Sequence, residues 1–86
     1  MHAVFLDVTF KDRAAALGEL ETLVPQVSGM PGFVAGYWVE MEGNRGKGLV
    51  AFESEEQARA LAQTVGGESP SVTNDSVAVG EVRASA

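Results

Sequence analysis

The sequence predicts one α+β domain, spanning residues 1–86, in which strands and helices follow the order βαββαβ. Four short segments have the period-two or continuously apolar pattern of strands, and two longer ones carry apolar residues at helical spacing. Turns rich in Gly, Pro and Asn separate several of them. A chain of 86 residues is long enough for one domain and too short for two.

The first strand is predicted over residues 2–10, where apolar side chains alternate. Its wholly apolar face carries Val4, Leu6, Val8 and Phe10. Asp12 is expected to cap a helix whose apolar residues recur from Ala16 to Val27 at three- and four-residue spacing. Pro25 is expected to kink that helix or end it early, and turn chemistry over residues 28–32 closes the segment.

Residues 33–42 alternate again and predict a second strand. One face carries Phe33, Ala35, Tyr37, Val39 and Met41, and the other carries Val34, Gly36, Trp38, Glu40 and Glu42. Residues 43–46 predict a hairpin turn, because Gly and Asn tolerate positive φ, and residues 48–52 form a short third strand. The three-glycine spacing of Gly43, Gly46 and Gly48 opens no helix, so it is no nucleotide-binding loop.

The second helix begins with a capping box, in which Ser54 and Gln57 can each bond the other's backbone N–H. Its apolar stripe comprises Ala58, Leu61, Ala62 and Val65. We expect Gly66 and Gly67 to end this helix, a loop over residues 68–75, and a fourth strand over residues 76–84.

These elements predict a ferredoxin-like fold, a four-stranded antiparallel sheet with both helices on one face, because strand–helix–strand crossovers are right-handed. The alternative is another α+β arrangement with the last strand detached. If the more apolar faces of the first two strands meet the helices, Phe5 and Trp38 point away from them. We therefore expect a homodimer with Trp38 at or near its contact. In the alternative, Asp7, Glu40 and Glu81 keep that face wet in a monomer.

Composition excludes several classes of function. The chain has no cysteine and one histidine, His2, so we expect no metal site and no cofactor. A net charge of −6, with six scattered basic residues, disfavours binding to nucleic acid or to an anionic membrane. The N-terminus lacks the pattern of a signal peptide, and cytoplasmic residence is the default expectation.

Residues 30–38 (MPGFVAGYW) and 51–58 (AFESEEQA) resemble the dimeric α/β-barrel superfamily, and more narrowly its antibiotic-biosynthesis-monooxygenase-like group. The resemblance implies two sheets packed face to face in a dimer, with a cleft between each sheet and its helices. Some members oxidise phenolic polyketides without a cofactor, and others degrade haem. This chain departs from the haem-degrading pattern: its first strand has no Asn, Phe52 takes the aromatic place on the third strand, and its second helix has no His.

Four residues are candidates for contact with a ligand: Tyr37, Trp38, Asp7 and Phe52. Tyr37 brings a hydroxyl onto an apolar face, and a small aromatic ligand is expected beside it, between the sheet and the helices. Asp7 and Glu40 can form a carboxylate pair if they lie on adjacent strands and face the same way. No residue is assigned a catalytic role.

Two functions remain open at this point. One is a cofactor-free, monooxygenase-like enzyme or a binder of small aromatic molecules. The other is a non-catalytic dimerisation or interaction module. The volume between the sheet and the helices separates them, since an open cavity with a few polar groups favours the first and solid packing favours the second.

Overall fold

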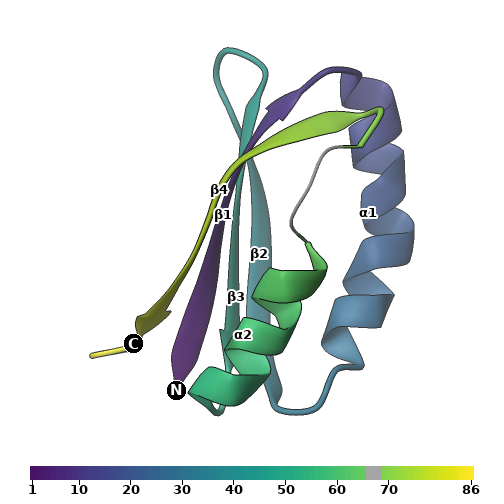
Figure 1. Ribbon diagram of the computed structural model, residues 1–86. Helices are drawn as coiled ribbons and strands as arrows, with labels where there is room; N and C mark the ends of the chain where they lie inside the picture. The colour runs from purple at the N-terminus through teal and green to yellow at the C-terminus, as the bar shows by residue number, and fades with distance from the viewer. Residues whose placement is uncertain (66–68) are drawn as a thin grey trace.

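A computed structural model describes residues 1–65 and 69–86 of the chain, and its elements follow the predicted βαββαβ order. The elements are β1 (His2–Phe10), α1 (Arg13–Ser28), β2 (Phe33–Met41), β3 (Arg45–Phe52), α2 (Glu55–Thr64) and β4 (Val72–Glu81). The strands form one antiparallel sheet in the order β2-β3-β1-β4, and both helices cover the same face of it (Figure 1). The ferredoxin-like prediction is confirmed.

Local sequence sets where both helices begin. The Asp12 carboxylate accepts from Ala15 N at 3.1 Å, and the Ser54 hydroxyl accepts from Gln57 N at 3.3 Å. Each bond satisfies a backbone N–H that has no partner inside the first helical turn. The return bond of the capping box is not made, because Gln57 Oε1 lies buried with no hydrogen-bond partner in the described chain.

Helix α1 continues through Pro25 to Ser28, so the expected early end is wrong. Pro25 lies in the last turn, where its missing N–H removes one hydrogen bond and its ring is opposed to one carbonyl, that of the residue four positions earlier; the helix still continues for three residues. Its carbonyl accepts from Gly29 N at 3.1 Å, which caps the helix. The backbone then enters β2 through Gly32, at a φ of 80° that favours glycine.

The hairpin between β2 and β3 is confirmed, with positive φ at both Gly43 (74°) and Asn44 (59°). The predicted fourth strand is displaced: β4 begins at Val72, where we expected a loop, and ends at Glu81. Val72 is paired with Phe10, and a bulge beside Asp7 and Val8 leaves Asp75 out of the backbone register with β1, although its carboxylate accepts from Thr9 Oγ1 at 2.6 Å. The predicted stop at residues 66–67 and the start of the loop at residue 68 lie outside the described residues.

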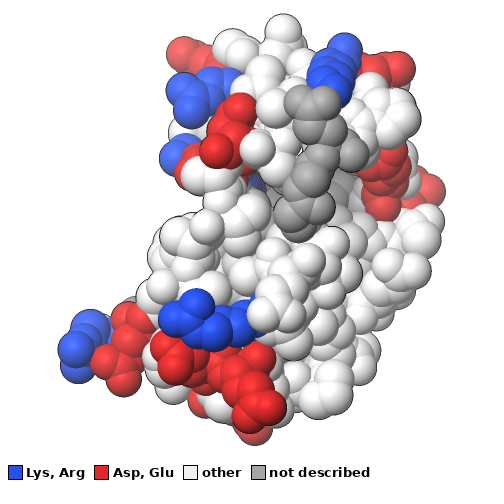
Figure 2. All heavy atoms as spheres, in the orientation of Figure 1, with Lys and Arg blue, Asp and Glu red and all other residues white. Residues whose placement is uncertain are grey.

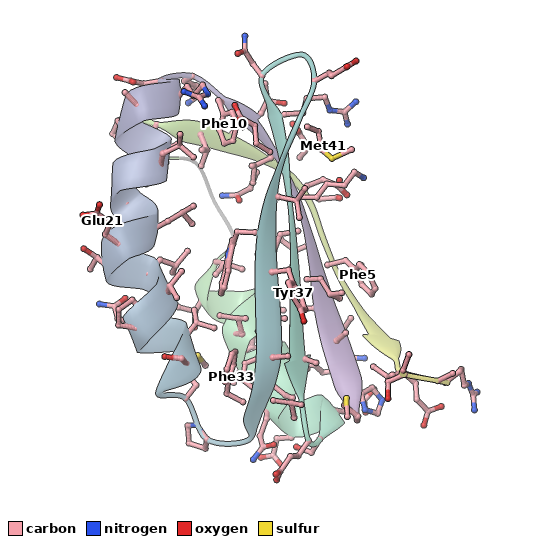
Figure 3. The ribbon with its side chains drawn as sticks, turned by 180° about the vertical axis from the view of Figure 1, so that it is seen from behind. Phe5, Phe10, Glu21, Phe33, Tyr37 and Met41 are labelled. Atoms are coloured by element: carbon pink, nitrogen blue, oxygen red, sulfur yellow. The ribbon has the colours of Figure 1, made fainter. Side chains whose placement is uncertain are left out.

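The predicted faces of β2 are wrong beyond Phe33. An irregularity in the β2–β3 register pairs Phe33 with Phe52 and Ala35 with Ala51, which changes the phase of the alternation. Phe33 therefore faces the helices, with its ring edge-on to Phe52, but Tyr37 turns to the opposite face and Trp38 turns inward. Figure 3 shows Phe10 and Phe33 between the sheet and α1, and Phe5 and Met41 on the other side.

The core lies where α2 meets the middle of the sheet. Its best-buried side chains share full or nearly full exclusion from water: Val4, Val50, Phe52, Ala58 and Leu61. Apolar side chains on two strands, β1 and β3, and on one helix, α2, thus fill one half of the layer between the sheet and the helices. Neither helix of the described chain is long and apolar enough to cross a bilayer.

Candidate functional site

A cavity of about 430 Å³ lies between the sheet and α1, in the half of the layer that the core does not fill. Its volume falls in the range of small-molecule sites. All four strands and both helices contribute to its walls. The described side chains that line it include Leu6, Val8, Phe10, Ala16, Leu17, Glu19, Leu20, Leu23, Trp38, Glu40, Thr64, Val65, Ser69, Val72 and Asn74.

Glycines form the floor of this cavity. A Cβ on Gly46 would lie 3.0 Å from the Phe10 ring, and one on Gly48 would lie 3.2 Å from Leu6 Cδ1. A Cβ on Gly36 would lie 3.0 Å from the Trp38 ring. The missing side chains let the two aromatic rings lie against the strands and leave the space above them open.

Trp38 is the only tryptophan of the chain, and it lines the cavity instead of pointing away from the helices as expected. Its indole lies over Gly36 and beside Gly48, both on the same face of the sheet. Its Nε1–H is buried and has no acceptor among the described residues. A buried donor left unpaired costs about 1–3 kcal/mol. Trp38 Nε1–H is therefore an unsatisfied hydrogen-bond donor at an otherwise apolar wall.

Helix α1 forms the roof of the cavity, and few of its side chains are buried. Only Ala16 and Val27 of this helix are fully buried, whereas Leu17, Leu20 and Leu23 are half-buried and line the cavity. A leucine stripe of this kind would normally close onto a sheet. Here the space beneath it stays open.

An ion pair joins α1 to β2 at one end of the cavity. Arg13 donates to Glu40 through Nε and through Nη2, the latter at 2.9 Å from Oε1. The hydrogen bonds from Arg13 lower the pKa of Glu40, and its charge acts in the same direction. Glu40 is therefore a carboxylate already neutralised by a cation of this chain.

Glu19 is the other carboxylate at the cavity, and it is held by a hydroxyl. Ser71 Oγ donates to Glu19 Oε2 at 2.8 Å, and Ser69 Oγ lies 3.1 Å from Ser71 Oγ. Ser71 is 1% exposed, and its carbonyl accepts from Lys11 N and Asp12 N, which fixes the segment beside the start of α1. Glu19 was not among the predicted ligand contacts; its place beside Ala16, Leu20 and Leu23 on the helix was the available signal.

The other ligand-binding candidates lie away from this cavity. Tyr37 is 63% exposed on the side of the sheet that carries no helix, which we call the open face. Phe52 is fully buried in the core against Phe33 and does not line the cavity. Asp7 lies on the open face, where Lys47 Nζ and Ser76 Oγ both donate to it at 2.8 Å. Hydrogen bonds from Lys47, and then from Ser76, lower the pKa of Asp7.

The proposed pairing of Asp7 with Glu40 is wrong. Strand β3 separates β1 from β2, so the two residues are not on adjacent strands. Asp7 is paired with Lys47 on the open face, whereas Glu40 is opposite Gly46 and faces the helices. The two carboxylates cannot share a proton across the sheet.

The open face has two contrasting rows of side chains. One row crosses all four strands in register and carries three bulky side chains, Tyr37, Leu49 and Phe5, followed by Ala78 on β4. The next row toward the chain ends is small: Ala35, Ala51, Ala3 and Gly80. A second hollow, of about 380 Å³, lies between these rows and residues 80–84.

Charged side chains gather at the two ends of the molecule in the view of Figure 2, with a band of uncharged surface between them. No protein-family model matches the chain, and no curated protein matches it. The resemblance to dimeric α/β barrels is therefore supported by the ferredoxin-like fold alone.

Proposed function

We propose that this chain binds a small, mostly apolar aromatic molecule in the cavity between the sheet and α1. The observation that carries the proposal is the cavity itself, about 430 Å³ with mainly aliphatic and aromatic walls and a few polar groups. A filled layer would have favoured the alternative of a pure interaction module. The likeness to the antibiotic-biosynthesis-monooxygenase-like group supports the same place for a ligand.

Two further features favour an aromatic ligand. The rings of Phe10 and Trp38 offer flat and edge surfaces to a third ring. The unpaired Trp38 Nε1–H would gain an acceptor if a small turn of the indole brought it to a ligand oxygen. A quinone or phenol supplies such an oxygen on an otherwise apolar body.

Binding is proposed here ahead of catalysis. Glu40 has a lowered pKa beside Arg13, which makes it a weak base for a phenol. Asp7 lies on the other side of the sheet. A monooxygenase-like reaction would nevertheless be visible as oxygen consumption when an anthrone-like ligand is mixed with the protein.

The test is a thermal-shift screen with anthrone-like, quinone and other aromatic ligands. A ligand present at a hundred times its Kd stabilises the folded chain by about 2.7 kcal/mol, which raises the melting temperature. We expect Leu20→Phe, which adds bulk to the cavity roof, to weaken binding at least about tenfold. Val24→Phe is the matched control, since Val24 lies one turn away on α1 and outside the cavity walls.

Tyr37→Phe is a second control, because Tyr37 lies on the open face and we expect its variant to bind as the wild type does. The binding proposal fails if no ligand raises the melting temperature and none changes the fluorescence of Trp38. It also fails if Val24→Phe and Leu20→Phe weaken binding equally.

We also propose that two copies pack through their open faces. Phe5, Tyr37 and Leu49 expose apolar surface in one row, and the neighbouring hollow lies between Phe5, Leu49 and residues 80–84. In a twofold dimer both features occur on each copy, so the bulky row of one can enter the hollow of the other. Tyr37 and Phe5 take the contact role that we had expected of Trp38.

Light scattering tests the dimer. The wild type should give twice the 9.0 kDa mass of one chain at micromolar concentration. Leu49→Asp should give the mass of a single chain, because a buried carboxylate would oppose the contact. Val24→Asp is the matched control, because Val24 and Leu49 are each 37% exposed but lie on opposite sides of the molecule's sheet. A 9.0 kDa wild-type particle would remove this part of the proposal.

A further inference from the structure

We infer that the ligand of the cavity carries a basic amine, held by the carboxylate of Glu19. This inference rests on the proposed binding function and adds the charge class of the ligand. It starts from the ionisable side chains among the described residues of the cavity wall, which are Glu19, Glu40 and Lys47.

Two of these three charges are already matched. The Lys47 ammonium reaches the open face, where it donates to Asp7 at 2.8 Å. Glu40 accepts two hydrogen bonds from Arg13. Glu19 takes part in none of the ion pairs found between described residues, so no described cation is paired with its negative charge.

Glu19 is also held in a defined position. Its Oε2 accepts from the buried Ser71 hydroxyl at 2.8 Å, and no other described residue donates to its carboxylate. Lys11 approaches the same segment, but its ammonium donates to the Ser69 carbonyl at 3.2 Å. Oε1 of Glu19 is therefore available to a donor on a ligand, beside walls that hold an apolar body.

Charge complementarity then favours a cation over an anion or a neutral molecule. A ligand carboxylate would meet Glu19, and the chain as a whole carries a net charge of −6. A neutral alcohol can donate to the Glu19 carboxylate, but without the gain of an ion pair. Because Glu19 is exposed to solvent, this gain corresponds to about threefold to fivefold in affinity.

The experiment compares three ligands that share one ring and a short side chain: naphthylethylamine, naphthylethanol and naphthylacetate. Calorimetry on the full chain should give the order amine, alcohol, carboxylate, with the amine about threefold to fivefold tighter than the alcohol at low salt. In Glu19→Gln the amine and the alcohol should bind equally, and the alcohol should bind as it does to the wild type. High salt should reduce the preference in the wild type.

Glu21→Gln is the matched control. Glu21 lies on the same helix and points away from the sheet in Figure 3, so its variant removes one negative charge without touching the cavity. It should keep the preference for the amine. A preference that survives in Glu19→Gln, or that Glu21→Gln also removes, would overturn the assignment to Glu19.

The outcomes separate the inference from the proposed function. Equal binding of all three ligands to the wild type overturns the amine inference and leaves the binding function in place. Binding of none of them, together with a negative aromatic screen, overturns both.

Discussion

The half of the domain under α2 and the half under α1 share one sheet but fill the space above it differently. Under α2, Val4, Val50 and Phe52 meet Ala58 and Leu61 with almost no access for water. Under α1, strand glycines and half-buried leucines border a cavity. We call these the packed half and the hollow half.

This difference separates the positions that determine the stability of the fold from those that are available to contact a ligand. Side chains of the packed half have a full set of neighbours, so truncation leaves a void. Side chains of the hollow half already border empty space. Stability should therefore depend on the packed half, and binding on the hollow half.

Leucine truncation on the two helices tests this contrast most strongly. Leu61→Ala, in the packed half and 2% exposed, should lower the free energy of unfolding by about 2–5 kcal/mol. Leu20→Ala, in the hollow half and half-buried, should cost about 1 kcal/mol, since little packing is lost. Urea denaturation of both variants measures the difference, and equal losses would contradict the division into two halves.

Glycine-to-alanine substitutions near the two halves should change the free energy of unfolding in opposite directions. At Gly32, beside the packed half, φ is positive and a Cβ would lie 1.8 Å from Gln57 Oε1, so Gly32→Ala should destabilise by about 1–3 kcal/mol. At Gly18, on α1, a Cβ meets nothing within 4 Å, so Gly18→Ala should stabilise by about 0.5–1 kcal/mol. The change in melting temperature gives the sign of each effect. A higher melting temperature in Gly32→Ala would show that a Cβ at this position causes no strain.

The smallest expected effect concerns acid and the ion pair that closes one end of the hollow half. The folded-state pKa of Glu40 is lowered by Arg13, so its contribution to stability is present above the unfolded pKa and is lost as the pH falls through the folded one. Part of the fall in melting temperature below about pH 4 should therefore be absent in Glu40→Gln. Asp7, whose pKa is lowered by Lys47, should supply another part, which Asp7→Asn removes.

Glu42→Gln is the control for this acid series, because Glu42 forms no ion pair among those found between described residues. Its acid profile should follow that of the wild type. An unchanged profile in Glu40→Gln would show that the ion pair with Arg13 adds nothing measurable to folding.

Several parts of the candidate site were within reach of sequence reasoning. The place of the cavity, between sheet and helices, followed from the resemblance and agrees with the structure. Trp38 was a ligand candidate and does line the cavity, although we had expected its side chain on the side of the sheet away from the helices. Gly46 was out of reach, because we had placed it in the hairpin turn and begun the third strand at Gly48, whereas β3 begins at Arg45 and both glycines lie on it.

The placement of Tyr37 and Trp38 shows why the rest was out of reach. Counting apolar residues on β2 favoured the face with Tyr37, Val39 and Met41 as the buried one. The register change after Phe33 reverses the alternation, and a bulge of one residue has no reliable signature in a single sequence. Strand order also explains why Asp7 and Glu40 do not pair, since β3 lies between their strands in the assembled sheet.

The order of the elements, the Asp12 and Ser54 caps and the hairpin at Gly43 and Asn44 could be predicted without coordinates, because they depend on residues a few positions apart. The covered side of β2, the partners of the carboxylates and the cavity under α1 became apparent only in the folded chain. Those outcomes depend on contacts between distant segments, such as Glu19 with Ser71 and Arg13 with Glu40. Local patterns specify elements, whereas burial and pairing are properties of the packed whole.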